Sequence, residues 1–284
     1  MTTYAICGAS GQLGHLVLDA LLEKVPAADV VALARDPAKL ADYAARGVEV
    51  RAADYDAPET LAPALAGVDR LLLISGSAIG QRPRQHRAVI DAAKQADVGY
   101  MAYTSILHAD RSPIKLGDEH RQTEDALAAS GLSYDLLRNG WYNENYIMAV
   151  KAQAEAGVIT GAQGDGRINS AARKDLAESA AAVLVNGKGG DIYELAGDHG
   201  WTLAEFAAEL SRQTGKPVTY VNMGEEDYAR SLMENGFPEY AAKVIANSAY
   251  ATSLGALEET DGTLGRLIGR PTTPIAETIA AALR

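Results

Sequence analysis

Short apolar runs alternate with longer segments of helical periodicity through the first half of the chain. The apolar runs are hydrophobic at consecutive positions, which is typical of strands buried on both faces of a parallel sheet. We predict strands at 3–7, 29–34, 48–52, 70–75, 98–104 and 133–138. The clearest helical segments between them are 11–25, 83–96 and 119–130. This alternation predicts an α/β fold, a Rossmann-type doubly wound parallel sheet with helices on both faces.

The alternation loosens after about residue 140, where a glycine-rich stretch precedes further helices. Helices are predicted at 175–187, 202–215 and 225–236, and a short strand at 217–221. We therefore expect a Rossmann domain over 1–150, with 157–200 completing the edge of its sheet. Residues 201–284 are expected to form a smaller, mostly helical C-terminal lobe.

Several residues mark where helices begin and end. Asp36 stands before Pro37 and is predicted to cap a helix that ends at Gly47. Thr202 and Glu205 have the spacing of a capping box, which predicts a helix start there. Pro63 lies inside an otherwise helical pattern and is expected to shorten it.

Composition narrows the class of protein. The chain has 284 residues, of which 48% are hydrophobic and 22% charged, as in globular proteins. No apolar run approaches the roughly 18 residues that a membrane span needs. The first residues lack the basic start and apolar stretch of a secretory signal, so we expect a cytoplasmic protein. The net charge of −11 argues against a nucleic-acid partner.

The single cysteine and the five histidines indicate no metal site. Cys7 cannot form an internal disulfide and lies in an apolar run, so we interpret it as a small buried residue and not as a nucleophile. The histidines have no ligand-like spacing with cysteine or with paired acids.

Three glycines, Gly8, Gly11 and Gly14, lie between the first predicted strand and the first predicted helix. This is the context of a dinucleotide-binding fingerprint, in which glycines allow a tight turn, close approach of a pyrophosphate, and close packing of helix on strand. The N–H groups at the start of the helix are then available to the phosphate. The alternative is a tight turn without a ligand.

Arg35 follows the second predicted strand, where a carboxylate usually holds the free 2′-hydroxyl of NAD. A guanidinium at that place suits the 2′-phosphate of NADP. The nearest acid, Asp36, is better explained as a helix cap. The alternative interpretation of Arg35 is a solvated charge at a strand end.

The order of motifs along nearly the whole chain resembles one family. The motifs are GASGQLG, ALARDPAKL, ADYDAPETL, LLLISGSAIGQR, AYTSILHAD, DEHRQTEDALAASGLSYDLLRNGWYNENY and LIGRPTTPIAET. They are similar to those of the NmrA-like atypical short-chain dehydrogenases/reductases, and most to the bacterial NADPH:quinone oxidoreductases of that group. Triphenylmethane dye reductases are near relatives. The segments RNGWYNENY and SILHADRSP are the most specific parts of the resemblance.

The resemblance implies a bound NADPH and a small C-terminal lobe that closes over the nicotinamide. It also implies which residues surround the cofactor. Carried onto this chain they are Gly8, Ala9, Ser10, Gly11, Gln12, Leu13, Arg35, Ser75, Gly76, Ser77, Asn139, Gly140, Trp141, Tyr142, Asn143 and Glu144. Most of these segments follow predicted strands, and ligands of open α/β sheets bind at the carboxyl ends of strands. Asp54 is open to two interpretations, contact with the adenine or helix capping.

The Tyr-x-x-x-Lys pair of ordinary short-chain dehydrogenases is absent, since Leu116 and His120 stand at those places. The usual acid for carbonyl reduction is therefore missing. A quinone is less demanding, because a weak donor or water can protonate the hydroquinone anion. Candidate catalytic residues are Asn145, Tyr142 and His120, the first two as hydrogen-bond donors to a quinone oxygen. Alternatively, the NGWYNENY segment is a polar loop whose aromatics fill a hinge, and His120 takes no part.

The resemblance leaves three functions open: an NADPH-dependent, flavin-free quinone reductase, a reductase of other flat acceptors such as triphenylmethane dyes, and a non-catalytic NADP(H) sensor. We favour the first, with a small-molecule quinone as substrate and a homodimer as one option for assembly. The arginine-rich segment 81–87 is interpreted as a solvated surface run, with an anion-binding role as the alternative.

Overall fold

The computed structural model describes residues 1–284, which divide into two compact units. The first, here the sheet unit, comprises Met1–Ile106, Glu119–Asn139 and Arg173–Glu194. The second unit comprises Leu107–Asp118, Gly140–Ala172 and Leu195–Arg284. Each is described by itself below.

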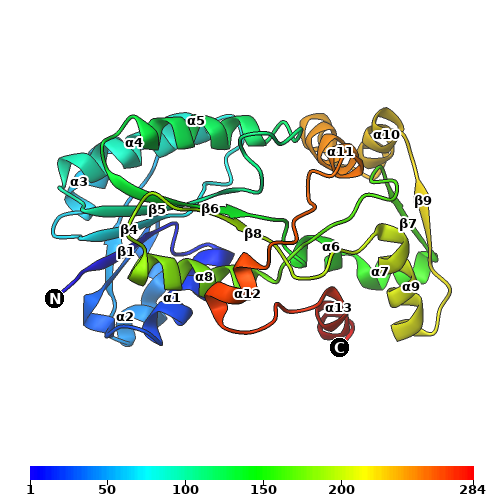
Figure 1. Ribbon diagram of the computed structural model, residues 1–284, viewed down its shortest axis with the longest axis horizontal. Coiled ribbons are helices and arrows are strands. Elements are labelled where there is room, and N and C mark those ends of the chain that lie inside the picture. Colours follow the sequence, from blue (N-terminus) through cyan, green and yellow to red (C-terminus); the bar gives the residue numbers. More distant parts are fainter. The chain divides into compact units, whose positions relative to one another are not determined.

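A sheet of seven strands forms the centre of the sheet unit (Figure 1). Its order is β3-β2-β1-β4-β5-β6-β8, and the pairs from β3 to β6 are parallel. The strands are β1 (Tyr4–Cys7), β2 (Val30–Ala34), β3 (Glu49–Ala52), β4 (Arg70–Leu73), β5 (Tyr100–Ile106), β6 (Ser133–Asn139) and β8 (Ile192–Leu195). The predicted Rossmann-type parallel sheet is confirmed. The strand order reverses between β1 and β4, and such a switch point opens a crevice beyond the carboxyl ends of the strands.

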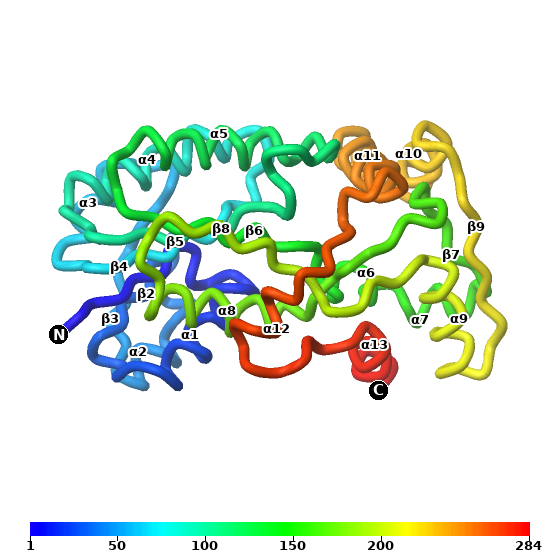
Figure 2. Tube along the Cα trace, in the orientation of Figure 1, coloured from blue at the N-terminus to red at the C-terminus, as the bar shows by residue number.

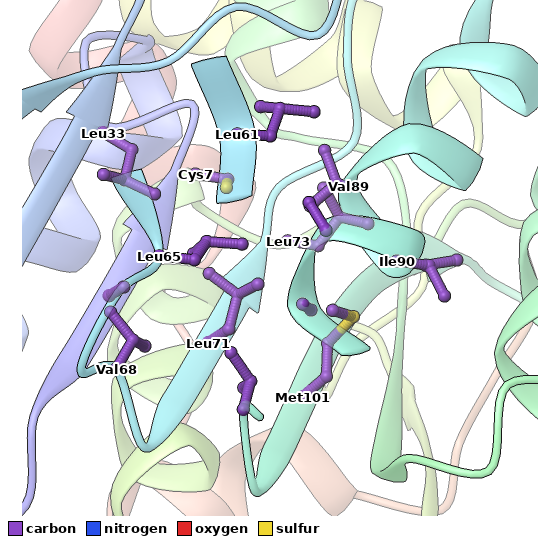
Figure 3. Packing of buried hydrophobic residues seen from close by; sticks show 14 of the residues in the cluster. Cys7, Leu33, Leu61, Leu65, Val68, Leu71, Leu73, Val89, Ile90 and Met101 are labelled. Atoms are coloured by element: carbon purple, nitrogen blue, oxygen red, sulfur yellow. The ribbon is translucent and has the colours of Figure 1, made fainter. Parts of the chain in front are cut away.

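Helices cover both faces of this sheet, as predicted. Figure 1 shows α3, α4 and α5 over one face and α1, α2 and α8 over the other. Their bounds are α1 (Gln12–Leu22), α2 (Ala41–Ala45), α3 (Leu61–Ala64), α4 (Arg82–Gln95), α5 (Gly117–Ala128) and α8 (Arg173–Asn186). Between the sheet and α3 and α4, alternate residues of the strands pack with helix residues in one core (Figure 3). Cys7, Leu71 and Met101 belong to this core, and burial of a side chain such as Leu71 or Met101 contributes about 1.5–3 kcal/mol.

The predicted helix limits hold where a capping residue was visible. The Asp36 carboxylate accepts a hydrogen bond from the Ala38 N–H at 3.1 Å, as expected of a cap. The helix that it begins is broken into a 3₁₀ turn, Pro37–Leu40, and the short α2. Pro63 has the predicted effect, since α3 spans only four residues.

The second unit is mostly helical and contains a two-stranded parallel sheet. Strands β7 (Val158–Gly161) and β9 (Thr219–Asn222) pair with Val158 opposite Thr219 and lie side by side in Figure 2. The helices are α6 (Glu144–Ile147), α7 (Val150–Ala156), α9 (Leu203–Thr214), α10 (Glu225–Glu234), α11 (Glu239–Ser253), α12 (Thr263–Ile268) and α13 (Ile275–Leu283). The predicted capping box of α9 is formed, with Thr202 and Glu205 bonded reciprocally. Strand β7 was not predicted.

None of these helices combines the length and the apolar character required to cross a membrane.

Candidate cofactor and active site

The glycine loop between β1 and α1 has the geometry that its three glycines predict. Gly8 adopts φ +74°, a conformation that side chains rarely accept. A Cβ on Gly14 would lie 2.4 Å from the Gly8 oxygen and 2.5 Å from the Ala9 oxygen, so only glycine allows this packing. At Gly11 the nearest atom to such a Cβ is the Gly8 oxygen at 3.3 Å, and Gly11 is exposed. The loop therefore leaves its outer surface open at Gly11.

The start of α1 has no side-chain cap and no acidic residue in its first turn. The free N–H groups of such a turn, with the helix dipole, attract an anion. Ser10, Gly11 and Gln12 are at least partly exposed there. Ala9 and Leu13, also predicted for the cofactor shell, are buried, and the Ala9 N–H donates to the Leu33 oxygen at 3.1 Å. Their side chains therefore support the loop from inside.

Arg35 is exposed at the end of β2 and forms no hydrogen bond or ion pair within the chain. Asp36, beside it, is occupied in capping the turn that follows. Asp54, at the end of β3, accepts the Asp56 N–H at 3.0 Å, which makes a local turn rather than a helix cap. The carboxyl end of β2 is thus followed by a guanidinium that is available to a phosphate.

Two buried polar atoms at the ends of β4 and β6 have no partner. They are the Ser75 hydroxyl and the Asn139 side-chain oxygen. The Ser75 N–H is itself bonded to the Thr104 hydroxyl at 2.8 Å, so this residue is fixed, while its hydroxyl lies near that of Tyr103 without a well-formed hydrogen bond. A buried polar group without a hydrogen bond costs about 1–3 kcal/mol, which a bound ligand or water recovers. Together with the glycine loop and Arg35, these atoms fit a dinucleotide at the carboxyl edge of the sheet.

The segment after β6 belongs to the second unit and is tied to it by its backbone. The Gly140 N–H donates to the Leu195 oxygen at 2.7 Å, and the Trp141 oxygen accepts from the Ala171 N–H at 3.0 Å. Tyr142 pairs with Ala171 in an isolated bridge, and Trp141, Tyr142 and Glu144 are partly buried.

The side chains of Asn143 and Asn145 differ in their surroundings. Asn143 is fully buried, and its amide donates to the Thr273 oxygen and the Thr278 hydroxyl and accepts from the Ser170 hydroxyl at 2.6 Å. These bonds occupy Asn143 inside the second unit. Asn145 is exposed and its side chain forms no hydrogen bond, so its amide is available to a substrate.

His120 is buried on α5. Its Nδ1 lies 2.8 Å from the Tyr103 hydroxyl. Burial, assisted by the positive charge of Arg82, lowers the pKa of His120 to about 3. The ring is thus neutral and occupied by Tyr103, and its role in turnover stays a prediction.

Cys7 is buried at the end of β1, as predicted, and burial raises the pKa of its thiol to about 12. A thiol of that pKa is a poor nucleophile at neutral pH. No cluster of three or more histidine, cysteine or acidic side chains has the arrangement of a metal site.

The interpretation of segment 81–87 as a solvated surface run is wrong for half of its polar residues. Arg84 and Arg87 are exposed, but Arg82, Gln85 and His86 are buried at 9%, 6% and 0% exposure. Their spacing of three and four residues places them on one helix face, which is the signal that could have been recognised. The number of charged residues in the segment does not indicate that one of its faces is buried.

Comparison with known proteins adds to this geometry. Residues 8–187 match the family described as NAD(P)H-binding. The chain belongs to that family. It is 52% identical over 277 residues to quinone oxidoreductase 2 of Escherichia coli, covering 97% of each chain. The crystal structure of NADPH-dependent quinone oxidoreductase QOR2 from that organism, complexed with NADPH, aligns with a TM-score of 0.97 and 51% identity over 99% of this chain and all of the other.

A second group of family relatives acts on dyes, by their names. Citrobacter sp. triphenylmethane reductase complexed with NADP(H) aligns with a TM-score of 0.94 and 38% identity over 99% of this chain and 100% of that one. The NAD(P)H azoreductase of Xenophilus azovorans is 30% identical over 280 residues, 96% of this chain and 95% of the relative.

Proposed function

We propose that this protein is an NADPH-dependent quinone oxidoreductase, which reduces a quinone to the hydroquinone by transfer of two electrons. The observation that carries the proposal is the full-length alignment with the NADPH-bound quinone oxidoreductase at a TM-score of 0.97. The residues of this chain agree with it, since the glycine loop, Arg35 and two unpartnered buried polar atoms fit the cofactor.

Several segments of the chain have a proposed role toward NADPH. The N–H groups of α1 and the loop Gly8–Leu13 bind the pyrophosphate, and Arg35 binds the 2′-phosphate. The Ser75 hydroxyl donates a hydrogen bond to the cofactor, and the Asn139 side-chain oxygen accepts one from it, since neither atom has a hydrogen-bond partner in the protein. Residues Gly140–Glu144 and Ser77 complete the cofactor shell in this proposal. When bound, NADPH supplies the hydride.

The residues also explain the choice of acceptor. Leu116 and the neutral His120 replace the acid that carbonyl reduction needs. A quinone that gains a hydride becomes an aromatic hydroquinone anion, which takes the remaining proton from water. We assign Asn145 and Tyr142 to orienting the quinone oxygen, because positioning of the acceptor is the main requirement. No flavin is required.

The experiment is a screen for NADPH oxidation with quinones, triphenylmethane dyes and aldehydes. We expect turnover with quinones by colourless protein without added flavin. The second candidate, dye reduction, is favoured by the likeness to triphenylmethane reductase and predicts higher kcat/KM for dyes. NADPH binding without oxidation of any acceptor would instead indicate a sensor. Strict dependence on added flavin would contradict the proposed mechanism.

Our proposal extends to the setting of the enzyme. A net charge of −11 disfavours nucleic acid, and we place the enzyme in the cytoplasm with a small-molecule quinone as its partner. Sedimentation analysis would decide between a monomer and the homodimer considered above.

A further inference from the structure

The buried face of α4 meets the loop that follows β4. Arg82 and His86 lie four residues apart on this face, and His86 is completely buried. The exposed residues of the same helix, Arg84 and Arg87, form ion pairs with Asp56 and Asp91. A buried histidine and a buried arginine are costly unless their polar atoms are bonded, so their partners indicate what they do.

His86 and Arg82 both bond to backbone groups of the same residue, Gly76. The Gly76 N–H donates to His86 Nε2 at 3.0 Å, and Arg82 Nε donates to the Gly76 oxygen at 2.6 Å. A Cβ on Gly76 would lie 3.3 Å from Gln85 Oε1, so the fit also favours glycine. The N–H and the oxygen of Gly76 are therefore used inside the protein.

The contacts of His86 define its tautomer. Nε2 accepts from an N–H and therefore carries a lone pair, so the proton is on Nδ1. Nδ1 donates to the Thr123 hydroxyl at 2.9 Å, which donates to the Glu119 oxygen at 3.0 Å. A chain of bonds thus connects the backbone of α5 to the loop after β4. Burial, and the charge of Arg82, lower the pKa of His86 to about 3, in agreement with a neutral ring.

The second anchor of the loop also comes from α5. The Glu119 carboxylate accepts the Gly80 N–H, and its other oxygen lies 3.5 Å from Arg82 Nη1. The loop from Ser75 to Gly80 is thereby held at both ends, and the Ser75 hydroxyl, with the Tyr103 hydroxyl nearby, forms no well-formed hydrogen bond of its own.

We propose that His86 and Arg82 are positioning residues, which hold the Gly76 peptide so that the Ser75 hydroxyl is presented to NADPH. This inference rests on the proposed function. It assigns a cofactor contact in this loop to Ser75, beside the one proposed for Ser77, and gives Gly76 a purely internal role. In this proposal Ser75 contacts the cofactor, and His86 and Arg82 orient Ser75.

Two substitutions at His86 separate the two ring nitrogens. Gln places an amide oxygen near the position of Nε2 and can accept the Gly76 N–H, whereas Asn places an amide near Nδ1 and can bond only Thr123. Each variant loses one of the two bonds. We expect His86→Asn to weaken NADPH binding about fivefold to tenfold, and His86→Gln to stay within about threefold of wild type. Calorimetry would give the dissociation constants, and thermal denaturation without NADPH would give Tm.

The controls test the rest of the proposal. Ser75→Ala is expected to weaken NADPH binding about fivefold with little change in Tm, and Arg84→Ala, on the exposed face of α4, should change neither. In wild-type protein, ¹⁵N NMR of the His86 ring should show the proton on Nδ1. Because this measurement is made on the wild-type protein, it does not depend on whether the variants fold.

The outcomes are distinguishable. A proton on Nε2, equal NADPH affinity in wild type and His86→Asn, or equal losses in His86→Asn and His86→Gln would overturn the positioning role. Wild-type protein that binds no NADPH would overturn the proposed function as well.

Discussion

Arg35 and Asp36 are adjacent charged residues with different bonding. The Asp36 carboxylate is used by the backbone of the next turn, whereas the Arg35 guanidinium forms no hydrogen bond or ion pair and interacts only electrostatically with Asp56. The sequence was sufficient to predict the Asp36 cap, because a strand end followed by Asp-Pro defines the cap by local chemistry. The sequence does not show whether the Arg35 guanidinium bonds to another residue of the chain.

Replacement of Arg35 by Ala is expected to weaken NADPH binding by roughly tenfold to a hundredfold and to leave NADH binding nearly unchanged. A guanidinium donates two parallel bonds to a phosphate, each worth about 1.5–3 kcal/mol before ordering costs. Lysine should restore only part of the loss, because it lacks the planar fork. Dissociation constants for both coenzymes decide this. Equal weakening of both coenzymes would mean that Arg35 does not recognise the 2′-phosphate.

The three glycines of the loop predict different effects of an added methyl group. Gly14→Ala places Cβ 2.4 Å from a backbone oxygen and should destabilise the protein by about 1–3 kcal/mol. Gly11→Ala meets only one atom, the Gly8 oxygen at 3.3 Å, and its φ of −82° suits any residue, so Tm should fall much less than in Gly14→Ala. It should nevertheless weaken NADPH binding, because the methyl group adds bulk at an exposed position of the loop proposed to bind the pyrophosphate. Urea denaturation and calorimetry on both variants test this, and an unaffected NADPH affinity in Gly11→Ala would argue against phosphate binding at this loop.

Asn145 and His120 can be ranked by their surroundings. Asn145 is exposed with an unbonded amide, and His120 is buried against Tyr103. Asn145→Ala is expected to lower kcat/KM for a quinone about tenfold or more, a loss of roughly 1.4 kcal/mol. His120→Gln should change turnover less. Steady-state kinetics of the two variants give the comparison, and the reverse order would transfer the role to His120.

At the scale of helices and strands, local signals predicted more than long-range pairing did. Six strands and the helix over 83–96 lie within a few residues of their predicted limits, because alternation and capping residues are local. Strand β7 was missed, since its four residues follow Gly157 and its partner β9 lies some sixty positions later. The buried face of α4 was missed because a polar side chain bonded to a backbone oxygen has no hydrophobic signal.

Helices α4 and α5 carry the histidines that should make stability depend on pH. His86 and His120 have pKa values lowered to about 3, against about 6.5 in an unfolded chain. The unfolded state therefore binds protons first as pH falls below about 6.5, and stability decreases down to about pH 3. His86 is faced by Arg82, Thr123, Tyr55 and Tyr103, and His120 by Arg82, His86 and Tyr103, without a carboxylate in hydrogen-bond contact with either ring.

We expect the free energy of unfolding to fall by about 1 kcal/mol per pH unit for each of these histidines between pH 6 and 4. Urea denaturation at several pH values measures the slope. His120→Gln should make that slope shallower by about the contribution of one histidine. A slope that is identical in the variant would show that the ring titrates normally in the folded protein.

At the scale of the molecule, the two compact units are not consecutive in the sequence. Each consists of three segments, so the chain passes between units after Ile106, Asp118, Asn139, Ala172 and Glu194. No shift in composition marks these passages, which is why a sequence supports only a linear division such as 1–150 and 201–284. That linear division, with a C-terminal lobe over the nicotinamide, stays a proposal. The helix α8, which packs on α1 in the sheet unit, already lies beyond residue 150.

Because Cys7 is buried, its reaction with a thiol reagent can report transient opening of the protein core. Cys7 is the single cysteine, lies at the end of β1 between β2 and β4, and has 0% exposure. A thiol reagent such as Ellman's can therefore react only in molecules whose core has transiently opened, and the labelling rate reports how often that happens. We expect very slow labelling of the native protein, and about a hundredfold slower labelling at NADPH concentrations of a hundred times Kd. Fast labelling that NADPH does not slow would mean that β1 detaches without disturbing the cofactor loop.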